Sequence, residues 1–441
     1  MIEVLIAILF VILIFSYFFT NRDYINPAIL FISGFIICCI VASGYKKEWQ
    51  LLLDETTTIL VTLSCIAFAI GQIGINHKRK IQNNITFTNI SNKKLLLLII
   101  TQILITIYIN VQRMKFTGLS FVDTIAQYNY ESKFGDFDLK LAPGVGFIAG
   151  FCNMFGYFCA ILIPLYHFNK TTDKKTIYLL WTNFLICSIS SLFSGSRGEL
   201  LNYIIALLYS YLFIHKLKGY SLFEAFSLKR VSVIIVSMYL FANSFAGLGS
   251  LLGRESSDDE YMTSDYIFAM YCGAEIVNLN NYIISTKKHK ILTKKFGENT
   301  FANLHNSYNS ENKKNRPDNY FESVNGYNLG NVKTCIYAPY ADFGFNGALI
   351  TMFLTSFLIS YIYRKSKDPN IIKSGIPTIY LFLLVYLCGN IFQAFFSNKI
   401  IEALERLINY RQILILLLMY IYFYGINVRM NTIKKHFITK W

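Results

Sequence analysis

Two short polar segments hold the residue types best suited to chemistry in an otherwise apolar chain. The first is Ser194-Gly195-Ser196-Arg197-Gly198-Glu199, where an arginine lies between glycines and a carboxylate follows. Arginine offers five N–H donors in a planar fork that fits phosphate, and glycine lets a ligand approach the backbone. The simpler interpretation is a turn from which Arg197 reaches lipid headgroups. We expect instead that Arg197 binds an anion, with Glu199 orienting it or acting as a base.

The second polar segment, 331–347, brings amide, hydroxyl, phenol and carboxylate groups to the start of an apolar stretch. Tyrosine rings can stack on sugar faces, although tyrosines also collect at membrane interfaces without binding a ligand. Asp342 could orient or deprotonate a hydroxyl group, or it could simply cap the helix that follows. The candidates in this segment are Asn331, Thr334, Tyr337, Tyr340 and Asp342.

Four further candidates are charged or titratable side chains in polar connections, namely Arg254, His305, Arg316 and Arg406. Arg254 directly follows an apolar stretch, whereas Arg316 has the setting of a solvated surface residue. His305 could act as a base near neutral pH, or it could be an ordinary exposed histidine. Arg406 could bind a ligand or pair with Glu402, four residues earlier. No metal-ligand spacing, phosphate loop or nucleophile motif is present, so we expect no metal and no cofactor.

The rest of the sequence predicts the scaffold that must position these residues. The chain is 54% hydrophobic and 16% aromatic, and its apolar residues come in long blocks. A helix needs about 20 apolar residues to cross the hydrocarbon core of a membrane. We therefore expect an all-α polytopic integral membrane protein, a single membrane domain over 1–441 with about 11 (10 to 12) transmembrane helices. The expected spans are 2–20, 27–45, 56–75, 95–112, 144–166, 177–194, 200–214, 231–253, 343–363, 375–398 and 412–428.

Orientation follows from the basic residues, because cytoplasmic connections are rich in Lys and Arg. About half of the 41 Lys and Arg residues lie in connections that alternate with polar, nearly neutral ones. We therefore expect a cytoplasmic C-terminus and two outward loops, 113–143 and the larger 254–342, with an amphipathic helix near 265–285. A disulfide between Cys272 and Cys335 is one open alternative. The net charge of +15 then suits membrane lipids and does not require nucleic acid. The basic connections are 21–26, 76–94, 167–176, 215–230, 364–374 and the tail after 428.

The polar motifs and their order resemble a known family. The turn Ser194-Gly195-Ser196-Arg197-Gly198, the large loop, Asn331-Val332-x-Thr334 and then Tyr340-Ala341-Asp342-Phe343-Gly344-x-x-Gly347 resemble the bacterial oligosaccharide repeat unit polymerases, the Wzy-type O-antigen polymerases. The resemblance implies a metal-independent glycosyltransferase of the bacterial inner membrane with a periplasmic active face. Such an enzyme moves the growing glycan from undecaprenyl pyrophosphate to the nonreducing end of another lipid-linked repeat unit. A chain-length regulator and a flippase would be its partners.

Under this resemblance, Arg197 and Arg254 would stabilise the departing pyrophosphate, and Asp342 or Glu199 would serve the acceptor hydroxyl. An O-antigen ligase-type transferase is the nearest alternative, and His305 keeps it open. A lipid-linked oligosaccharide flippase is the alternative from another class. A flippase should carry charges inside its spans and have short outer loops, whereas the expected spans are nearly uncharged and one outer loop is long.

Overall fold

The structure of the 441-residue chain is a computed structural model. It describes residues 1–73, 90–134, 141–168, 173–193, 197–219, 261–288, 296–304, 321–367, 377–408 and 410–425. The expected span 231–253 lies outside these residues, as do the candidates Arg254, His305 and Arg316. Arg197 begins a helix, but its side chain also lies outside the described part of the chain.

The described part of the chain is mostly helical, and eight of its helices are long and apolar enough to cross a membrane. This confirms the expected class, an α-helical membrane protein. The pair α17 (Lys399–Ile408) and α18 (Tyr410–Tyr424) bends by 71° and would make a ninth span if counted as one, while α16 (Ile379–Phe392) is apolar but shorter. The eight are α1 (Ile2–Phe19), α2 (Pro27–Gly44), α3 (Glu55–Ile73), α4 (Asn92–Thr117), α6 (Val145–His167), α7 (Lys174–Phe193), α8 (Arg197–Leu217) and α14 (Tyr337–Ser366).

These helices bury one face and leave large apolar side chains exposed on the other. Phe15 of α1, Leu104 of α4 and Phe357 of α14 are each more than half exposed. On the buried side, Phe31 of α2 stacks on Phe68 of α3 with ring centroids 4.0 Å apart. A soluble protein rarely leaves so much apolar surface uncovered, so these faces suit contact with lipid.

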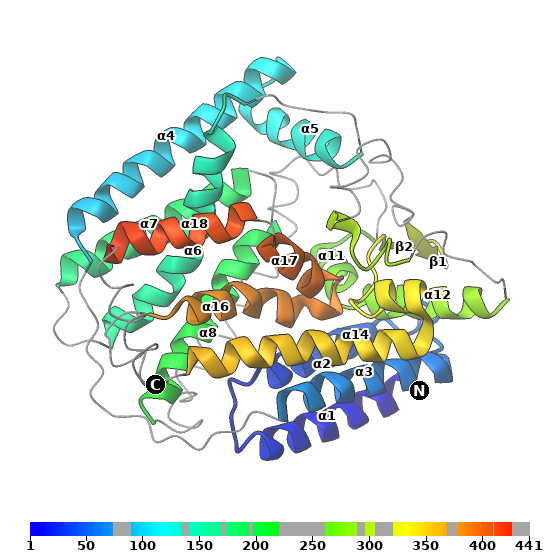
Figure 1. Cartoon of the computed structure of the whole chain (residues 1–441). Helices are drawn as coiled ribbons and strands as arrows, with labels where there is room; N and C mark the ends of the chain where they lie inside the picture. Colours follow the sequence, from blue (N-terminus) through cyan, green and yellow to red (C-terminus); the bar gives the residue numbers. More distant parts are fainter. Residues whose placement is uncertain are drawn as a thin grey trace.

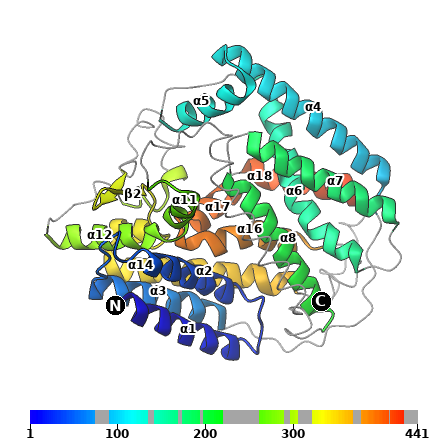
Figure 2. The same cartoon turned by 180° about the vertical axis from the view of Figure 1, so that it is seen from behind.

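The helices form two groups joined by a central pair (Figures 1 and 2). In one group α14 packs along α3, next to α1 and α2, and in the other α6 packs against α7, with α4 beside α7. Helices α8 and α16 pack on each other between the groups. The start of α8 and the end of α16 therefore lie in the middle of the molecule.

Helix α14 folds back on itself at Gly344. Cys335 and Met352 are 17 positions apart, which would separate them by about 25 Å along a continuous helix. Their sulfur atoms are instead 3.9 Å apart. Gly344 has φ 71° and ψ −168°, a backbone conformation open essentially to glycine alone. The polar segment 331–347 thus turns back beside the main part of α14, and does not run straight into a span as its sequence suggests.

The expected loops contain more structure than their sequences indicated. The loop 113–143 holds α5 (Phe121–Phe134), and its first residues belong to α4. The amphipathic helix expected near 265–285 is two helices, α11 (Ser264–Cys272) and α12 (Ala274–Lys288). Gly273 separates them and packs so closely on α2 that a Cβ atom there would lie 2.8 Å from the backbone nitrogen of Ala42.

Two further features of the large loop differ from expectation. Strands β1 (Glu322–Val324) and β2 (Tyr327–Gly330) form an antiparallel hairpin within a chain expected to be wholly helical. Cys272 and Cys335 are free thiols, so the disulfide left open by the sequence does not form. Cys335 is buried, and its backbone N–H donates to the carbonyl of Ala394 at 2.8 Å.

Ion pairs link the connections at both ends of the helices. Near the start of α1, Lys46 binds Glu3 at 2.8 Å. Beyond the other end of α1, Asp23 accepts hydrogen bonds from the Tyr363 hydroxyl at 2.7 Å and from Lys367. The α1–α2 connection and the C-terminal end of α14 therefore lie together, as the expected alternation of spans requires.

Candidate functional site

Glu199 lies at the centre of a polar cluster formed by residues of α6, α8, α16 and α17. It is the third residue of α8, and its Oε1 atom accepts a hydrogen bond from the Tyr157 hydroxyl of α6 at 2.9 Å. Arg406 and Lys399, both on α17, act electrostatically on the same carboxylate. Two candidates from distant parts of the sequence, Glu199 and Arg406, are therefore neighbours in the structure.

Tyrosines surround this carboxylate and hold its neighbours in place. The Tyr157 ring packs edge-on against Tyr203 at 4.8 Å and against Tyr386 at 5.1 Å. Arg406 also acts electrostatically on the Tyr386 hydroxyl of α16. We name Glu199, Tyr157, Tyr386, Lys399 and Arg406 the Glu199 cluster. It combines one carboxylate, two phenols and two cations, with the two tyrosines buried and Arg406 exposed.

Arg113 fixes the end of α7, four residues before Arg197. Its Nη1 atom donates to the carbonyl of Phe193, the last residue of α7, at 2.8 Å. Its guanidinium lies 4.1 Å from the centre of the Tyr128 ring. A cation at a helix C-terminus satisfies an open carbonyl and complements the helix dipole. The sequence placed Arg113 at the start of a loop and gave it no role.

Helix α17 pairs its charges differently from the expected Glu402–Arg406 contact. Glu402 lies 3.2 Å from Lys399, three residues earlier. Arg406 instead acts electrostatically on Glu199 and Tyr386. The two cations of α17, Lys399 and Arg406, are seven residues apart, about two turns, and therefore share one face of the helix.

Asp342 has a structural task. It lies inside α14 and is not at its start, so it does not cap that helix. Its Oδ2 atom accepts the backbone N–H of Thr300 at 2.6 Å and that of Asn299 at 3.1 Å, and Oδ1 accepts the Asn299 side-chain amide at 2.9 Å. With both oxygens engaged by amide donors, Asp342 is less suited than Glu199 to accept a proton.

The segment 296–304 bridges α14 and α17. At the end of this segment away from Asp342, the Glu405 carboxylate accepts hydrogen bonds from the Asn303 side-chain amide at 2.9 Å and from the Leu304 backbone N–H at 3.3 Å. Between them, the Asn398 amide donates to the Thr300 carbonyl at 2.9 Å. Through this segment, the folded-back part of α14 is joined to the helix that carries Arg406.

Of three remaining candidates in 331–347, two pack within the structure and the third lines a small cavity. Thr334 is 1% exposed, and its hydroxyl accepts the backbone N–H of Ile336 at 3.3 Å. Tyr337 packs against Tyr282, with centroids 4.6 Å apart, and Lys333 lies 5.0 Å from the centre of its ring. Asn331 lines a small cavity of about 50 Å³ between α11 and the hairpin. These positions are more structural than the sequence suggested.

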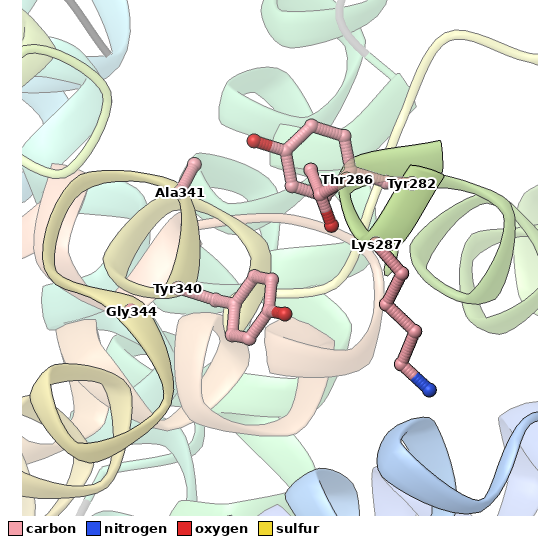
Figure 3. Close-up of a pocket in the computed structure, with 6 residues that line it drawn as sticks. All are labelled: Tyr282, Thr286, Lys287, Tyr340, Ala341 and Gly344. Atoms are coloured by element: carbon pink, nitrogen blue, oxygen red, sulfur yellow. The ribbon is translucent and has the colours of Figure 1, made fainter. Parts of the chain in front are cut away.

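Tyr340 differs because it faces a pocket between α12 and α14 (Figure 3). The pocket has a volume of about 260 Å³. Lys287, at its edge, binds Asp54 with an N–O distance of 2.6 Å. This contact holds the pKa of the Asp54 carboxyl below its usual value. The lining residues are Tyr282, Thr286, Lys287, Tyr340, Ala341 and Gly344.

Comparisons with known proteins found no match, because no family model, curated protein or solved structure is similar to the chain. The site is therefore interpreted from its own residues. It has two parts, the Glu199 cluster and the pocket beside Tyr340, with the segment 296–304 joined to both α14 and α17. Sequence reasoning missed Tyr157, Tyr386 and Arg113. A tyrosine within an apolar stretch carries no local signal of a binding role, and Arg113 stood at the start of an expected loop.

Proposed function

We propose that the protein is a metal-independent membrane glycosyltransferase of the O-antigen polymerase type. It would transfer the growing glycan from undecaprenyl pyrophosphate to the nonreducing end of another lipid-linked repeat unit. The observation that carries the proposal is the Glu199 cluster. In it, two cations act on a carboxylate that lies two positions after Arg197 in the sequence. The motifs that resemble the Wzy-type polymerases include this same turn.

The reaction needs one base and strong stabilisation of a leaving group. An acceptor hydroxyl oxygen attacks the anomeric carbon of the donor glycan, and the bond between that carbon and the pyrophosphate oxygen breaks. The hydroxyl proton passes to the Glu199 carboxylate, while undecaprenyl pyrophosphate departs with the bonding electron pair. Arg406 and Lys399, together with Arg197, would offset its negative charge.

Glu199 is the better base because of where the two candidate carboxylates lie. The Asp342 oxygens accept amide hydrogen bonds from residues 299 and 300. Glu199 instead lies beside Arg406 and Lys399, where the charge of a pyrophosphate would also be stabilised. In this proposal Asp342 shapes the site by holding the segment 296–304, and the reacting proton goes to Glu199.

The proposed location is the bacterial inner membrane, with the C-terminus in the cytoplasm and the Glu199 cluster toward the periplasm. Support comes from the connections at the end opposite to the start of α1. Lys216 donates to the Arg22 carbonyl there at 3.3 Å, close to the Asp23–Lys367 pair. Such an excess of basic residues is typical of the cytoplasmic side.

Deletion of the gene tests the proposal in cells. Loss of a polymerase should leave lipid A core that carries a single repeat unit in place of a ladder of lengths. Loss of a flippase would leave core with no repeat unit, and loss of a ligase would leave long glycan on undecaprenyl pyrophosphate. The length distribution on gels, with and without a plasmid copy of the gene, distinguishes the three outcomes.

A further inference from the structure

The pocket between α12 and α14 has the form of a subsite for a single sugar ring. Its volume of about 260 Å³ is small beside that of a cleft for a whole oligosaccharide. One wall is the folded-back part of α14, with Tyr340 and Gly344, and the other is α12, with Tyr282 and Thr286. Figure 3 shows the Tyr340 ring between the two helices, with its hydroxyl directed toward the α12 side.

Tyr340 is the tyrosine available for stacking in this region. Tyr337 already has Tyr282 against its ring at 4.6 Å and the Lys333 ammonium over it at 5.0 Å. Tyr340 makes only a longer edge contact with Tyr282, at 6.3 Å, and lines the pocket directly. A half-buried phenol ring offers a flat apolar face for the C–H groups of a sugar and a hydroxyl for its oxygens.

The charge at the pocket edge is already balanced. Lys287 is the charged residue among those that line the pocket, and its ammonium lies 2.6 Å from Asp54. The Asp54 carboxylate also accepts the backbone N–H of Thr56 at 2.8 Å, which fixes its position at the start of α3. A ligand carboxylate would have to compete with Asp54 for the same ammonium and would face its negative charge.

We propose that this pocket binds one uncharged sugar ring of the glycan substrate through Tyr340, and that the Asp54–Lys287 pair disfavours sugar acids at this subsite. The inference rests on the proposed function, because it names the kind of sugar that the glycan presents here. It assigns a specificity role to Asp54 and Lys287, which lie on two different elements far apart in the sequence.

Saturation-transfer NMR with the whole protein in a zwitterionic detergent that carries no sugar tests the proposal. The probes are the methyl glycosides of glucose, N-acetylglucosamine and glucuronic acid. We expect saturation of a neutral probe with the wild-type protein and none of the glucuronide. Tyr340→Leu should abolish the signal, while Tyr340→Phe should keep the part that comes from stacking.

The variant Asp54→Asn gives the more decisive test with the same probes, because asparagine still caps α3 but removes the charge that pairs with Lys287. The glucuronide should then saturate. Glu3→Gln, which releases Lys46 from a similar pair, is the matched control and should change nothing. The proposal is overturned if the wild-type protein binds the glucuronide, if Asp54→Asn does not admit it, or if no probe is saturated. If these binding results fail while Arg197→Ala still loses polymerisation, the proposed subsite is rejected and the proposed function remains supported.

Discussion

The Oδ2 atom of Asp342 accepts the backbone N–H of Thr300 at 2.6 Å, across 42 positions of sequence. This bond joins the folded-back start of α14 to the segment 296–304, which Glu405 and Asn398 attach to the region of α17. The polar residues of 331–347 thus act largely on other backbone segments. Their effect on a substrate would be through the shape they impose.

Asp342→Ala should loosen this segment before it affects any chemical step. It leaves at least two buried or half-buried amide donors without an acceptor, which costs about 1–3 kcal/mol. We expect faster hydrogen exchange at residues 299–304 and a lower unfolding midpoint. Asp265→Asn, at an exposed position of α11, is the control and should change neither. Unchanged exchange with lost polymerisation would instead make Asp342 a direct participant.

Glu199→Gln should abolish chain lengthening while the protein still inserts and folds. The amide keeps the shape and can accept the Tyr157 hydrogen bond, but it cannot take a proton. Loss of a general base typically costs about 10²–10⁴ in rate. The assay is the ladder of glycan lengths made by membranes that contain equal amounts of protein. Glu55→Gln, in the exposed first turn of α3, makes the same change and should leave a full ladder.

Arg197→Ala should give the same loss as Glu199→Gln, because the pyrophosphate would lose a principal cation. The variant should reach the membrane in normal amounts, as measured by immunoblot. Purified protein should release undecaprenyl pyrophosphate from a lipid-linked repeat unit much more slowly. A wild-type distribution of glycan lengths from this variant would contradict the role given to the turn.

Gly344→Ala should destabilise the fold even though the added methyl group has room. Among the described residues, no heavy atom beyond the local backbone lies within 4 Å of a Cβ built at Gly344, so the cost arises from φ 71° and ψ −168°. That cost is about 1–3 kcal/mol. Gly44→Ala is the matched control, because it too has open space but lies at the helical end of α2. Thermal unfolding in detergent should separate the two variants, and equal midpoints would exclude the strained fold-back.

Glu275→Met should stabilise the protein, and more so at higher pH. Glu275 is 1% exposed, and neither oxygen has a hydrogen-bond partner among the described residues. Burial raises the pKa of this carboxyl well above the ordinary value of 4.5. The contribution of Glu275 to stability is therefore fully present below pH 4.5, where both states are protonated, and is lost as the pH rises toward the folded-state pKa. The difference between the unfolding midpoints at pH 5 and pH 8 should be smaller in the variant than in the wild-type protein. An equal difference in the two proteins would contradict this origin.

The sequence predicted the membrane helices well and the site only in pieces. The span expected at 2–20 is α1, Ile2–Phe19, because an unbroken apolar run fixes both ends. Helix α14 begins at Tyr337, six residues before the expected span, since its polar side chains bind other segments instead of water. Glu199 and Arg406 were each singled out, but their proximity depends on how α8, α16 and α17 pack. No local pattern encodes that packing.

The thiols of this chain offer a direct route to its topology. All nine cysteines are unpaired, and eight of them are buried. Reducing agents should therefore leave the fold unchanged, and native thiols should react slowly with a membrane-impermeant maleimide. Single cysteines introduced into each connection can then be labelled from one side of the membrane in the otherwise unaltered protein, without first building a cysteine-free version.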